Sequence, residues 1–310
     1  MILSMYYYVY NHQHKGQPYH RAMKTAGHTA NLRKADVTLF DRDQVMNSTQ
    51  PRYQVTEQLE RGSLIMIYPH SALPPWWYDG LVPVRDYLSC VFVIGEAHKA
   101  ATSVFMPGAR VEVAGWPWCV QKPFKVPKQV KRVLFAPIHM AGGLRPEAYE
   151  ANRSIFRELK RIKRNENVEI VIRYIGELQE QGLKPYREFE FVEGFRDGAT
   201  REIDRADVVI AEGTFMYLAV ARGVPTVGIN QHLPTRANKN YARYTPHTWN
   251  DYGYLFSYPI NYKPGQLREL IEQAAAGEQS EWRANNIGKD MDPLAFAETV
   301  EEIWREKQKY

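Results

Sequence analysis

The chain has 310 residues, of which 44% are hydrophobic and 24% charged, a balance that indicates a globular protein with one large or two smaller domains. No apolar run approaches the roughly 20 residues of a membrane-spanning helix, and the first residues lack the basic start of a signal peptide. The two cysteines, Cys90 and Cys119, form no Cys-x-x-Cys pair, which argues against a zinc site. Reduced thiols fit the cytoplasm, where we expect the protein to be.

The charge and the aromatic content restrict the class of partner only loosely. A net charge of +5 is compatible with phosphate-bearing partners, nucleic acid among them, and equally with a solvated basic surface. Aromatic residues make up 13% of the chain, and several of the 20 tyrosines lie beside His or Arg. Such a mixture suits stacking combined with polar contacts.

The first part of the chain predicts short buried strands, each followed by a polar loop. We expect strands at 6–10, 37–40, 64–68, 91–94 and 110–114, with a helix over 19–32. The loop after the first strand, NHQHKGQPYH, contains His12, a candidate general base or phosphate contact. A metal held by the histidines of this loop is the alternative. The second strand ends in Asp41-Arg42-Asp43, which is either a charged turn, the interpretation that we favour, or a pair of carboxylates around a divalent cation.

Two later loops add candidate site residues. Trp76 and Trp77, in LPPWWYDG, either stack on a sugar or base of the acceptor or serve packing alone. Asp79 lies in the same loop, and Glu96 follows the strand at 91–94. We take Glu96, Asp79 and His12, in that order, as candidates for the catalytic base, because each follows a predicted strand or lies on the rim of the expected site.

A domain boundary is predicted in WPWCVQKPFKVPKQV, where prolines alternate with lysines in a composition typical of linkers. We place one domain at 1–121 and the other at 122–310. The second domain predicts strands at 132–136, 168–174, 189–192 and 208–210, and helices that begin at Pro146 and cover 267–274 and 293–308. Arg173 lies near the carboxyl end of its strand, where it is placed to pair with a ligand phosphate.

One face of the helix that begins at Pro146 is basic. Its cations are Arg153, Arg157, Lys160 and Arg164. Contact with phosphates is one interpretation of this face, and a solvated surface is the one that we favour.

The stretch GTFMYLAVARGVPTVGIN, at 213–230, predicts a turn, a helix and a strand directly after the buried strand at 208–210. In an open parallel sheet, ligands bind at the carboxyl ends of the strands, and a helix N-terminus there attracts phosphate. We therefore expect Gly213 and Thr214 to contact such a ligand. An ordinary strand-helix-strand unit with a glycine at its turn is the alternative. The loop after Asn230 is rich in Arg, Lys, Tyr and His, and Arg236 and Tyr241 are candidates for acceptor binding.

Both halves alternate strands and helices, which predicts an α/β protein with two doubly wound Rossmann-like domains facing a central cleft. The ligand is then expected in that cleft.

Four segments resemble the two-Rossmann GT-B superfamily, which comprises nucleotide-sugar glycosyltransferases and the non-hydrolysing UDP-N-acetylglucosamine 2-epimerases. These segments are VIGEAHKA, VEVAGWPW, RVLFAPIHMAGG and DRADVVIAEGTFMYLAVARGVPTVGI, and the likeness covers about two thirds of the chain. The last of them is similar to the donor-binding segment of the family. The resemblance implies that the first domain binds the acceptor and the second binds the nucleotide-sugar, with the C-terminal helix crossing back to the first domain.

The resemblance also implies which residues contact the donor: His139, Gly142, Gly143, Gly213 and Thr214, which Arg173 would join from the end of its strand. Relatives place a glutamate in the donor helix to hold the ribose, but Tyr217-Leu218-Ala219-Val220 contains no carboxylate. Ribose recognition then falls to Glu212 or to the loop after Asn230. The paired glutamates of the epimerases are absent too, which argues against epimerisation.

The predicted activity is transfer of a sugar from a nucleotide-diphosphate donor, a UDP-sugar by preference, to a hydroxyl group. The reaction needs no cofactor besides the donor, and cationic groups at the diphosphate make a metal unnecessary. A hydroxymethylated base in viral DNA is one acceptor that the basic charge and the aromatic residues permit. An isomerase of the epimerase type and a non-catalytic nucleotide-binding or nucleic-acid-binding protein are the alternatives. The sequence leaves the oligomeric state open.

Overall fold

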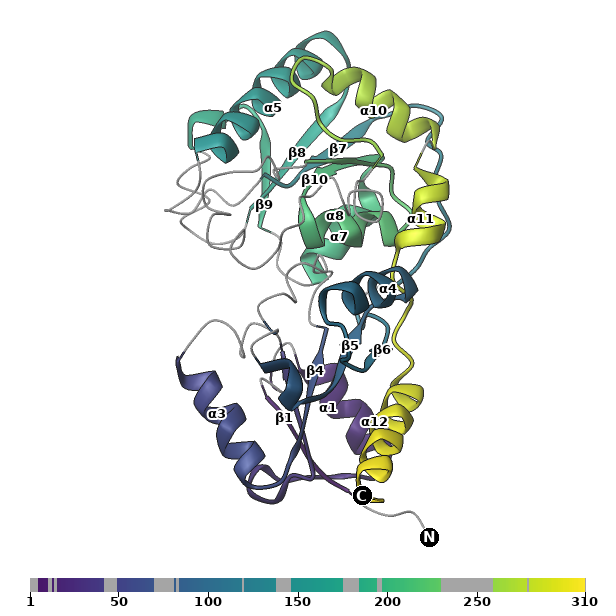
Figure 1. Cartoon of the computed structure of the whole chain (residues 1–310). Coiled ribbons are helices and arrows are strands. Elements are labelled where there is room, and N and C mark those ends of the chain that lie inside the picture. Colours follow the sequence, from purple (N-terminus) through teal and green to yellow (C-terminus); the bar gives the residue numbers. More distant parts are fainter. Residues whose placement is uncertain are drawn as a thin grey trace. The chain divides into compact units, whose positions relative to one another are not determined.

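A computed structural model describes residues 5–10, 13, 16–41, 49–69, 81, 84–118, 120–137, 146–174, 184–193, 197–229, 259–277 and 279–309 (Figure 1). The chain divides into two compact units. The first unit comprises Met1–Cys119 together with Gly288–Tyr310, and the second comprises Val120–Ile287. Among the described residues, no helix has both the length and the apolar character that crossing a membrane requires.

The first unit is built on a parallel sheet with the strand order β2-β1-β3-β4-β5-β6. Its strands are β1 (Tyr6–Val9), β2 (Thr29–Ala30), β3 (Val37–Asp41), β4 (Leu64–Tyr68), β5 (Leu88–Val93) and β6 (Val111–Val113). All five residues of β3 are buried, as expected for a central parallel strand that is covered on both faces and so shows no alternation of buried and exposed residues.

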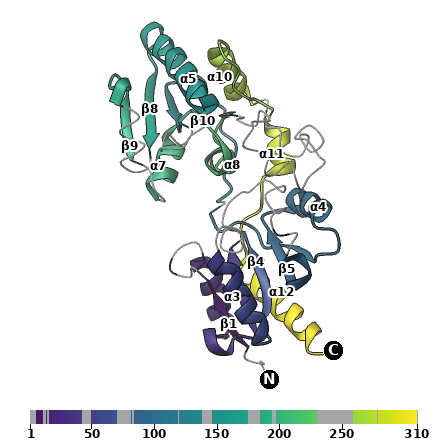
Figure 2. The ribbon, with the colours of Figure 1, turned by 60° about the vertical axis from the view of Figure 1, so that its left-hand side comes forward.

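The helices of the first unit pack on this sheet. They are α1 (Gln17–Thr25), the 3₁₀ helix η1 (Leu32–Lys34), α3 (Thr49–Glu60), α4 (Glu96–Phe105) and α12 (Pro293–Lys307). Phe296 of α12 lies against two aromatic rings, Tyr19 of α1 at 5.0 Å and Phe92 of β5 at 4.9 Å between ring centroids. The C-terminal helix therefore completes the core of the first unit, beside α1 (Figures 1 and 2).

The second unit is built on a parallel sheet with the strand order β11-β10-β7-β8-β9. Its strands are β7 (Arg132–Phe135), β8 (Glu169–Tyr174), β9 (Glu190–Glu193), β10 (Val208–Ala211) and β11 (Thr226–Gly228). Its helices are α5 (Pro146–Asn165), η3 (Lys184–Tyr186), α7 (Asp197–Arg205), α8 (Gly213–Ala221), α10 (Leu267–Ala276) and α11 (Ser280–Asn286). Two doubly wound parallel sheets confirm the predicted α/β fold class.

The structure corrects the predicted helix over 19–32. Helix α1 ends at Thr25, where the His28 N–H bonds to the Met23 carbonyl and Gly27 takes φ +88°. This is a glycine-terminated helix end of the Schellman type, which turns the chain sharply. Thr29–Ala30 then pairs with β1 as an edge strand, and η1 follows.

Other local differences follow from weak apolar patterning. Helices α3, α4, α7 and α11 were not predicted, because their sequences lack the long apolar stripe that distinguishes a helix. Asp41 is the last residue of β3 and is only 1% exposed, and the charged turn predicted to follow it lies outside the described residues. Its partner in that motif, Asp43, lies outside the described residues.

Candidate functional site

The strand order of the second sheet reverses between β7 and β10. From β7 the chain proceeds through β8 and β9 on one side, then returns to add β10 and β11 on the other. The two strands at the reversal pair directly, with Val208 opposite Val133 and Ile210 opposite Phe135. In open α/β sheets, ligands bind outside the carboxyl ends of the strands at such a switch point.

Helix α8 begins at this point, one residue after β10 ends. Glu212 occupies the N-cap position with extended backbone (φ −118°, ψ 166°), and its side chain makes no capping hydrogen bond to the helix. The first N–H groups of a helix have no partner within it, and the helix dipole adds a partial positive charge. Thr214, in the first turn, has an exposed side chain. The start of α8 therefore offers N–H donors and a hydroxyl to an anion.

Burial fixes the direction of α8. The helix is apolar on all sides, which is typical of a helix enclosed by protein. Ala219, Val220 and Ala221 are fully buried, and Tyr217 is buried as well. Because the helix cannot rotate without losing these contacts, its N-terminus is held at the sheet edge. The same apolar character means that α8 itself carries no carboxylate for a ribose.

A guanidinium group from another strand reaches the start of α8. Arg173 is the penultimate residue of β8, and its Cζ atom lies 4.1 Å from the centroid of the Phe215 ring in the first turn of α8. Strand β7 lies between β8 and β10, so these two strands are roughly 10 Å apart, and the Arg173 side chain and the Phe215 ring bridge this distance together. Burial lowers the pKa of Arg173 from 12.5 to about 10, so the group stays charged at neutral pH.

Positive charge from two sources thus converges at the carboxyl edge of the second sheet. The helix terminus contributes fixed dipoles, and Arg173 contributes a full charge in a partly desolvated position, where electrostatic interactions are stronger than in water. Such an arrangement suits the diphosphate of a nucleotide.

The structure brings together four of the predicted site residues: Glu212, Gly213, Thr214 and Arg173. Glu96 was predicted in a loop, but it is the first residue of α4 in the first unit, directly after β5 and Gly95, with an exposed side chain. The remaining predicted site residues lie outside the described part of the chain: His12, Trp76, Trp77, Asp79, His139, Gly142, Gly143, Arg236 and Tyr241.

Sequence reasoning missed Phe215. It follows the Gly213-Thr214 turn, and within the sequence nothing links it to Arg173, which lies on a strand far earlier in the chain. Only the strand order places the two side chains in contact.

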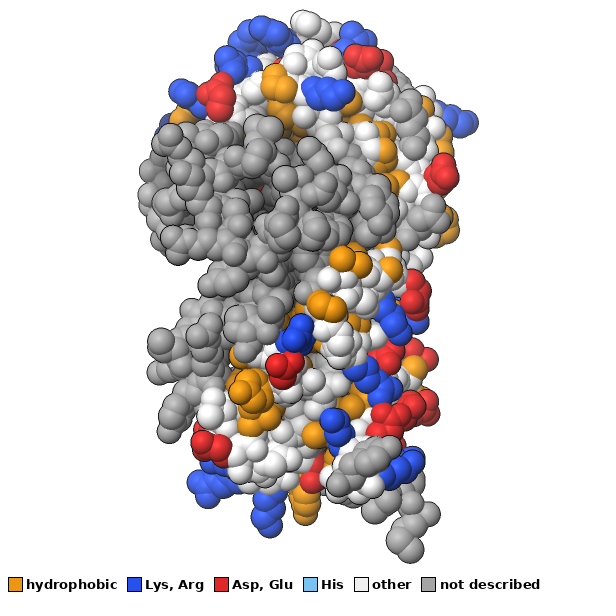
Figure 3. All heavy atoms as spheres, viewed as in Figure 1, with side chains coloured by type: hydrophobic (Ala, Val, Ile, Leu, Met, Phe, Trp, Pro, Cys, Tyr) orange, Lys and Arg blue, Asp and Glu red, His pale blue; other side chains and the backbone are white. Residues whose placement is uncertain are grey.

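Two charged surfaces elsewhere are better explained by solvation. On α5, Arg153 and Arg157 both face Glu150, and Lys160 pairs with Glu188 at 2.7 Å. A few red side chains lie among the blue ones over the upper part of the second unit (Figure 3). This agrees with the solvated face that we favoured from the sequence.

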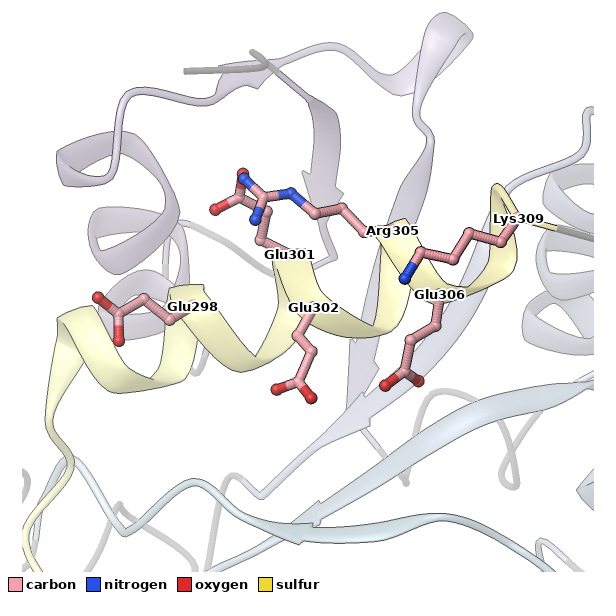
Figure 4. Close-up of a pocket in the computed structure, with 6 residues that line it drawn as sticks. All are labelled: Glu298, Glu301, Glu302, Arg305, Glu306 and Lys309. Atoms are coloured by element: carbon pink, nitrogen blue, oxygen red, sulfur yellow. The ribbon is translucent and has the colours of Figure 1, made fainter. Parts of the chain in front are cut away.

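The second charged surface is a shallow pocket on α12 (Figure 4). It is lined by Glu298, Glu301, Glu302, Arg305, Glu306 and Lys309. Glu301 pairs with Arg305 at 2.5 Å, and Glu306 pairs with Arg110 at 2.5 Å. In the part of the chain that the structure describes, no group of three or more His, Cys, Asp or Glu side chains is placed to hold a metal ion.

No protein-family model matches the chain, and no curated protein sequence matches it. Among solved structures, a variant of the wall teichoic acid polymerase TagF matches 100% of this chain and 91% of its own, with 9% identity and a TM-score of 0.56. A glycosyltransferase from Rickettsia africae ESF-5 matches over 99% of both chains, with 11% identity and a TM-score of 0.52. MurG from Acinetobacter baumannii matches 99% of this chain and 100% of its own, with 11% identity and a TM-score of 0.50.

Coverage is not complete for every match. The chain spans 58% of the length of the crystal structure of TarM, with a TM-score of 0.48. At identities this low, the likeness shows the fold. The chain has the two-Rossmann GT-B fold, which confirms the resemblance predicted from sequence at the level of architecture.

Proposed function

We propose that this protein is a glycosyltransferase that moves a sugar from a nucleotide-diphosphate donor, a UDP-sugar, to a hydroxyl group. The observation that carries the proposal is the convergence of the α8 N-terminus and Arg173 at the switch point of the second sheet. The structural neighbour from Rickettsia is named a glycosyltransferase, and the fold is shared over nearly the whole of both chains. Both facts support this function over other uses of a Rossmann-like domain.

The proposed chemistry follows from where charge develops. As the bond between sugar and diphosphate breaks, negative charge accumulates on the leaving diphosphate, and donors aligned in advance stabilise it. In our proposal, the N–H groups of Gly213 and Thr214 and the guanidinium of Arg173 supply this stabilisation. His139, Gly142 and Gly143 would join them from the loop after β7. Removing one such contact costs about 3 kcal/mol, which is roughly a hundredfold in rate.

Glu212 is our proposed contact for the ribose hydroxyls. Helix α8 lacks a carboxylate, and Glu212 immediately precedes it. The Glu212 side chain makes no capping hydrogen bond to the helix. Its replacement by glutamine would weaken UDP binding more than inorganic diphosphate binding, because only UDP has a ribose.

For the catalytic base we propose three candidates, and for the acceptor only a chemical class. Glu96, Asp79 and His12 remain the candidate bases, and the true one is the residue whose loss abolishes transfer while donor binding persists. The acceptor in the proposal is a hydroxyl group. A DNA base as acceptor rested on Trp76, Trp77, Arg236 and Tyr241, and no described residue adds support for it.

A thermal-shift panel with UDP, GDP, CDP, ADP and their common sugar conjugates tests the donor, with Mg²⁺, with Mn²⁺ and with chelator. A ligand at about 100 times its Kd adds about 2.7 kcal/mol to stability, which raises the midpoint by several degrees. Arg173→Gln should lose this shift. Arg161→Gln is the matched control, because Arg161 is an exposed residue of α5 in the same unit.

The outcomes separate the alternatives. A shift with one nucleotide that Arg173→Gln abolishes and Arg161→Gln retains supports the proposal. Conversion of the donor sugar without any acceptor would instead indicate an isomerase. Absence of a shift with every nucleotide, or equal shifts in both variants, would overturn the proposed donor site.

A further inference from the structure

We propose that Arg283 is a positioning residue for the donor site and acts from the far end of α8, opposite Gly213 and Thr214. The inference rests on the proposed function and deepens it. Arg283 belongs to α11, and its Nε donates a hydrogen bond to the Val220 carbonyl at 2.9 Å. Its Nη2 donates to the Ala221 carbonyl at 3.1 Å. Val220 and Ala221 are the last two residues of α8, so one guanidinium holds both carbonyls at the C-terminus of the helix.

Such bonds position a helix in a way that its apolar sides do not. Apolar packing is non-directional, whereas a hydrogen bond weakens steeply when its distance or angle departs from the optimum. The last carbonyls of a helix lack partners within it, and a cation at this end also interacts favourably with the helix dipole. Arg283 therefore satisfies two such carbonyls and sets the position of α8 along its own axis.

The same end of α8 is tied to two further parts of the second unit. Nη2 of Arg283 also donates to the Lys122 carbonyl at 2.5 Å, in the connector (residues 120–131) that leads into β7. The Lys122 N–H donates to the Ala221 carbonyl at 3.1 Å, and the Lys122 Nζ pairs with Asp204 of α7 at 2.8 Å. Arg222, directly after α8, donates to the same carboxylate through its Nε at 2.7 Å. Arg283 thus joins α11 to an end of α8 that the connector and α7 already hold.

A shift at this end reaches the donor site because α8 is a short, stiff helix. Its nine residues, Gly213–Ala221, span about 13 Å at 1.5 Å per residue. A binding site works only when its groups are held within about 0.5 Å of the productive geometry. Without the bonds from Arg283, we expect α8 to shift along its axis. The N–H groups of Gly213 and Thr214 would then lie out of line with the proposed diphosphate.

The test measures affinity by calorimetric titration at a temperature well below the unfolding midpoint. The probe is the nucleoside diphosphate, among UDP, GDP, CDP and ADP, that stabilises the wild-type protein most. We expect Arg283→Met, which removes the donors and the charge, to bind it about tenfold more weakly, because hydrogen bonds to the charged diphosphate are misaligned. Arg283→Lys keeps the charge without the planar fork, so its affinity should lie between those of Arg283→Met and the wild type.

Gly265→Ala is the control for a loss of stability alone. Gly265 lies in the same unit with φ +84°, so a side chain there strains the backbone, yet a Cβ atom meets nothing within 4 Å. This variant should lose stability in urea unfolding and bind the probe as tightly as the wild type. A role of Arg283 in stability alone predicts the same for Arg283→Met, with a lower free energy of unfolding and unchanged affinity. That result would overturn the inference while leaving the proposed donor site intact.

The remaining outcomes are equally decisive. Equal weakening in Gly265→Ala and Arg283→Met would also overturn the inference, because any destabilised variant would then bind poorly. Should Arg283→Met fail to fold, Arg283→Lys decides alone, and wild-type affinity in that variant would contradict the positioning role. If no nucleoside diphosphate binds the wild-type protein, the proposed function itself fails and the inference falls with it.

Discussion

Gly223, which follows the C-terminus of α8, provides a sharp test of how the second unit is held together. It adopts φ +71°, a left-handed conformation, and the connector between the sheets passes directly over it. The Lys122 N–H bonds to the Ala221 carbonyl at 3.1 Å, and the Lys125 N–H bonds to the Gly223 carbonyl at 2.7 Å. A Cβ atom on Gly223 would lie 2.1 Å from the Pro123 carbonyl oxygen.

Two costs add up in Gly223→Ala. A left-handed conformation costs a residue with a side chain about 1–2 kcal/mol. The overlap with backbone atoms cannot be relieved by a rotamer change, so the connector must move by about 1 Å, and overpacking of this kind costs about 1–3 kcal/mol. We therefore expect a loss of about 2–5 kcal/mol in the free energy of unfolding.

Gly265 is the matched control within the same unit. It also has a left-handed backbone, with φ +84°, but a Cβ atom placed there meets nothing within 4 Å. Gly265→Ala should therefore lose only about 1–2 kcal/mol. Urea unfolding followed by circular dichroism measures both losses. Equal losses in the two variants would refute the argument, because the backbone conformation alone would then account for them.

Three further changes test other parts of the structure. Burial lowers the pKa of His98 from 6.5 to about 4, so the unfolded state binds a proton more readily than the folded state. The free energy of unfolding should therefore keep its full value above pH 6.5 and fall by about 3 kcal/mol as the pH drops to 4. His98→Leu should remove that part of the acid sensitivity in urea titrations at pH 4 and 7, and an unchanged pH dependence would contradict it. Glu158 accepts hydrogen bonds from the Gly265 and Leu267 N–H groups, both at 2.9 Å, and from the Tyr262 hydroxyl at 2.6 Å. Glu158→Gln should destabilise by about 1–3 kcal/mol and speed amide exchange at Leu267, and unchanged exchange there would argue against a capping role. Asp292 caps α12 by accepting hydrogen bonds from the Leu294 and Ala295 N–H groups. Asp292→Ala should therefore lower the free energy of unfolding, measured in urea, by about 1 kcal/mol, whereas Asp292→Asn, which keeps an acceptor oxygen, should lower it little. Similar losses in both variants would exclude the cap as the cause.

The sequence by itself determined the central strands and the place where α8 begins. The runs at 37–40, 64–68 and 208–210 are mostly apolar because parallel strands covered on both faces bury nearly all their side chains. The positions of Gly213 and Thr214 at the start of α8 and of Arg173 near the end of β8 could be predicted for a similar reason, since each follows from its place at the end of a predicted strand. Such signals are local, and a few neighbouring residues are enough to carry them.

Only the tertiary structure decided which distant residues meet. The order β8-β7-β10 brings Arg173 to Phe215, and no local pattern contains that order, because it depends on how strands from separate parts of the chain pair. The polar helices α3 and α7 were missed because they lack a long apolar stripe, whereas the early end of α1 follows from a local signal, Gly27, that the prediction overlooked. For α3 and α7, packing against their sheets outweighs the weak preference of the local sequence.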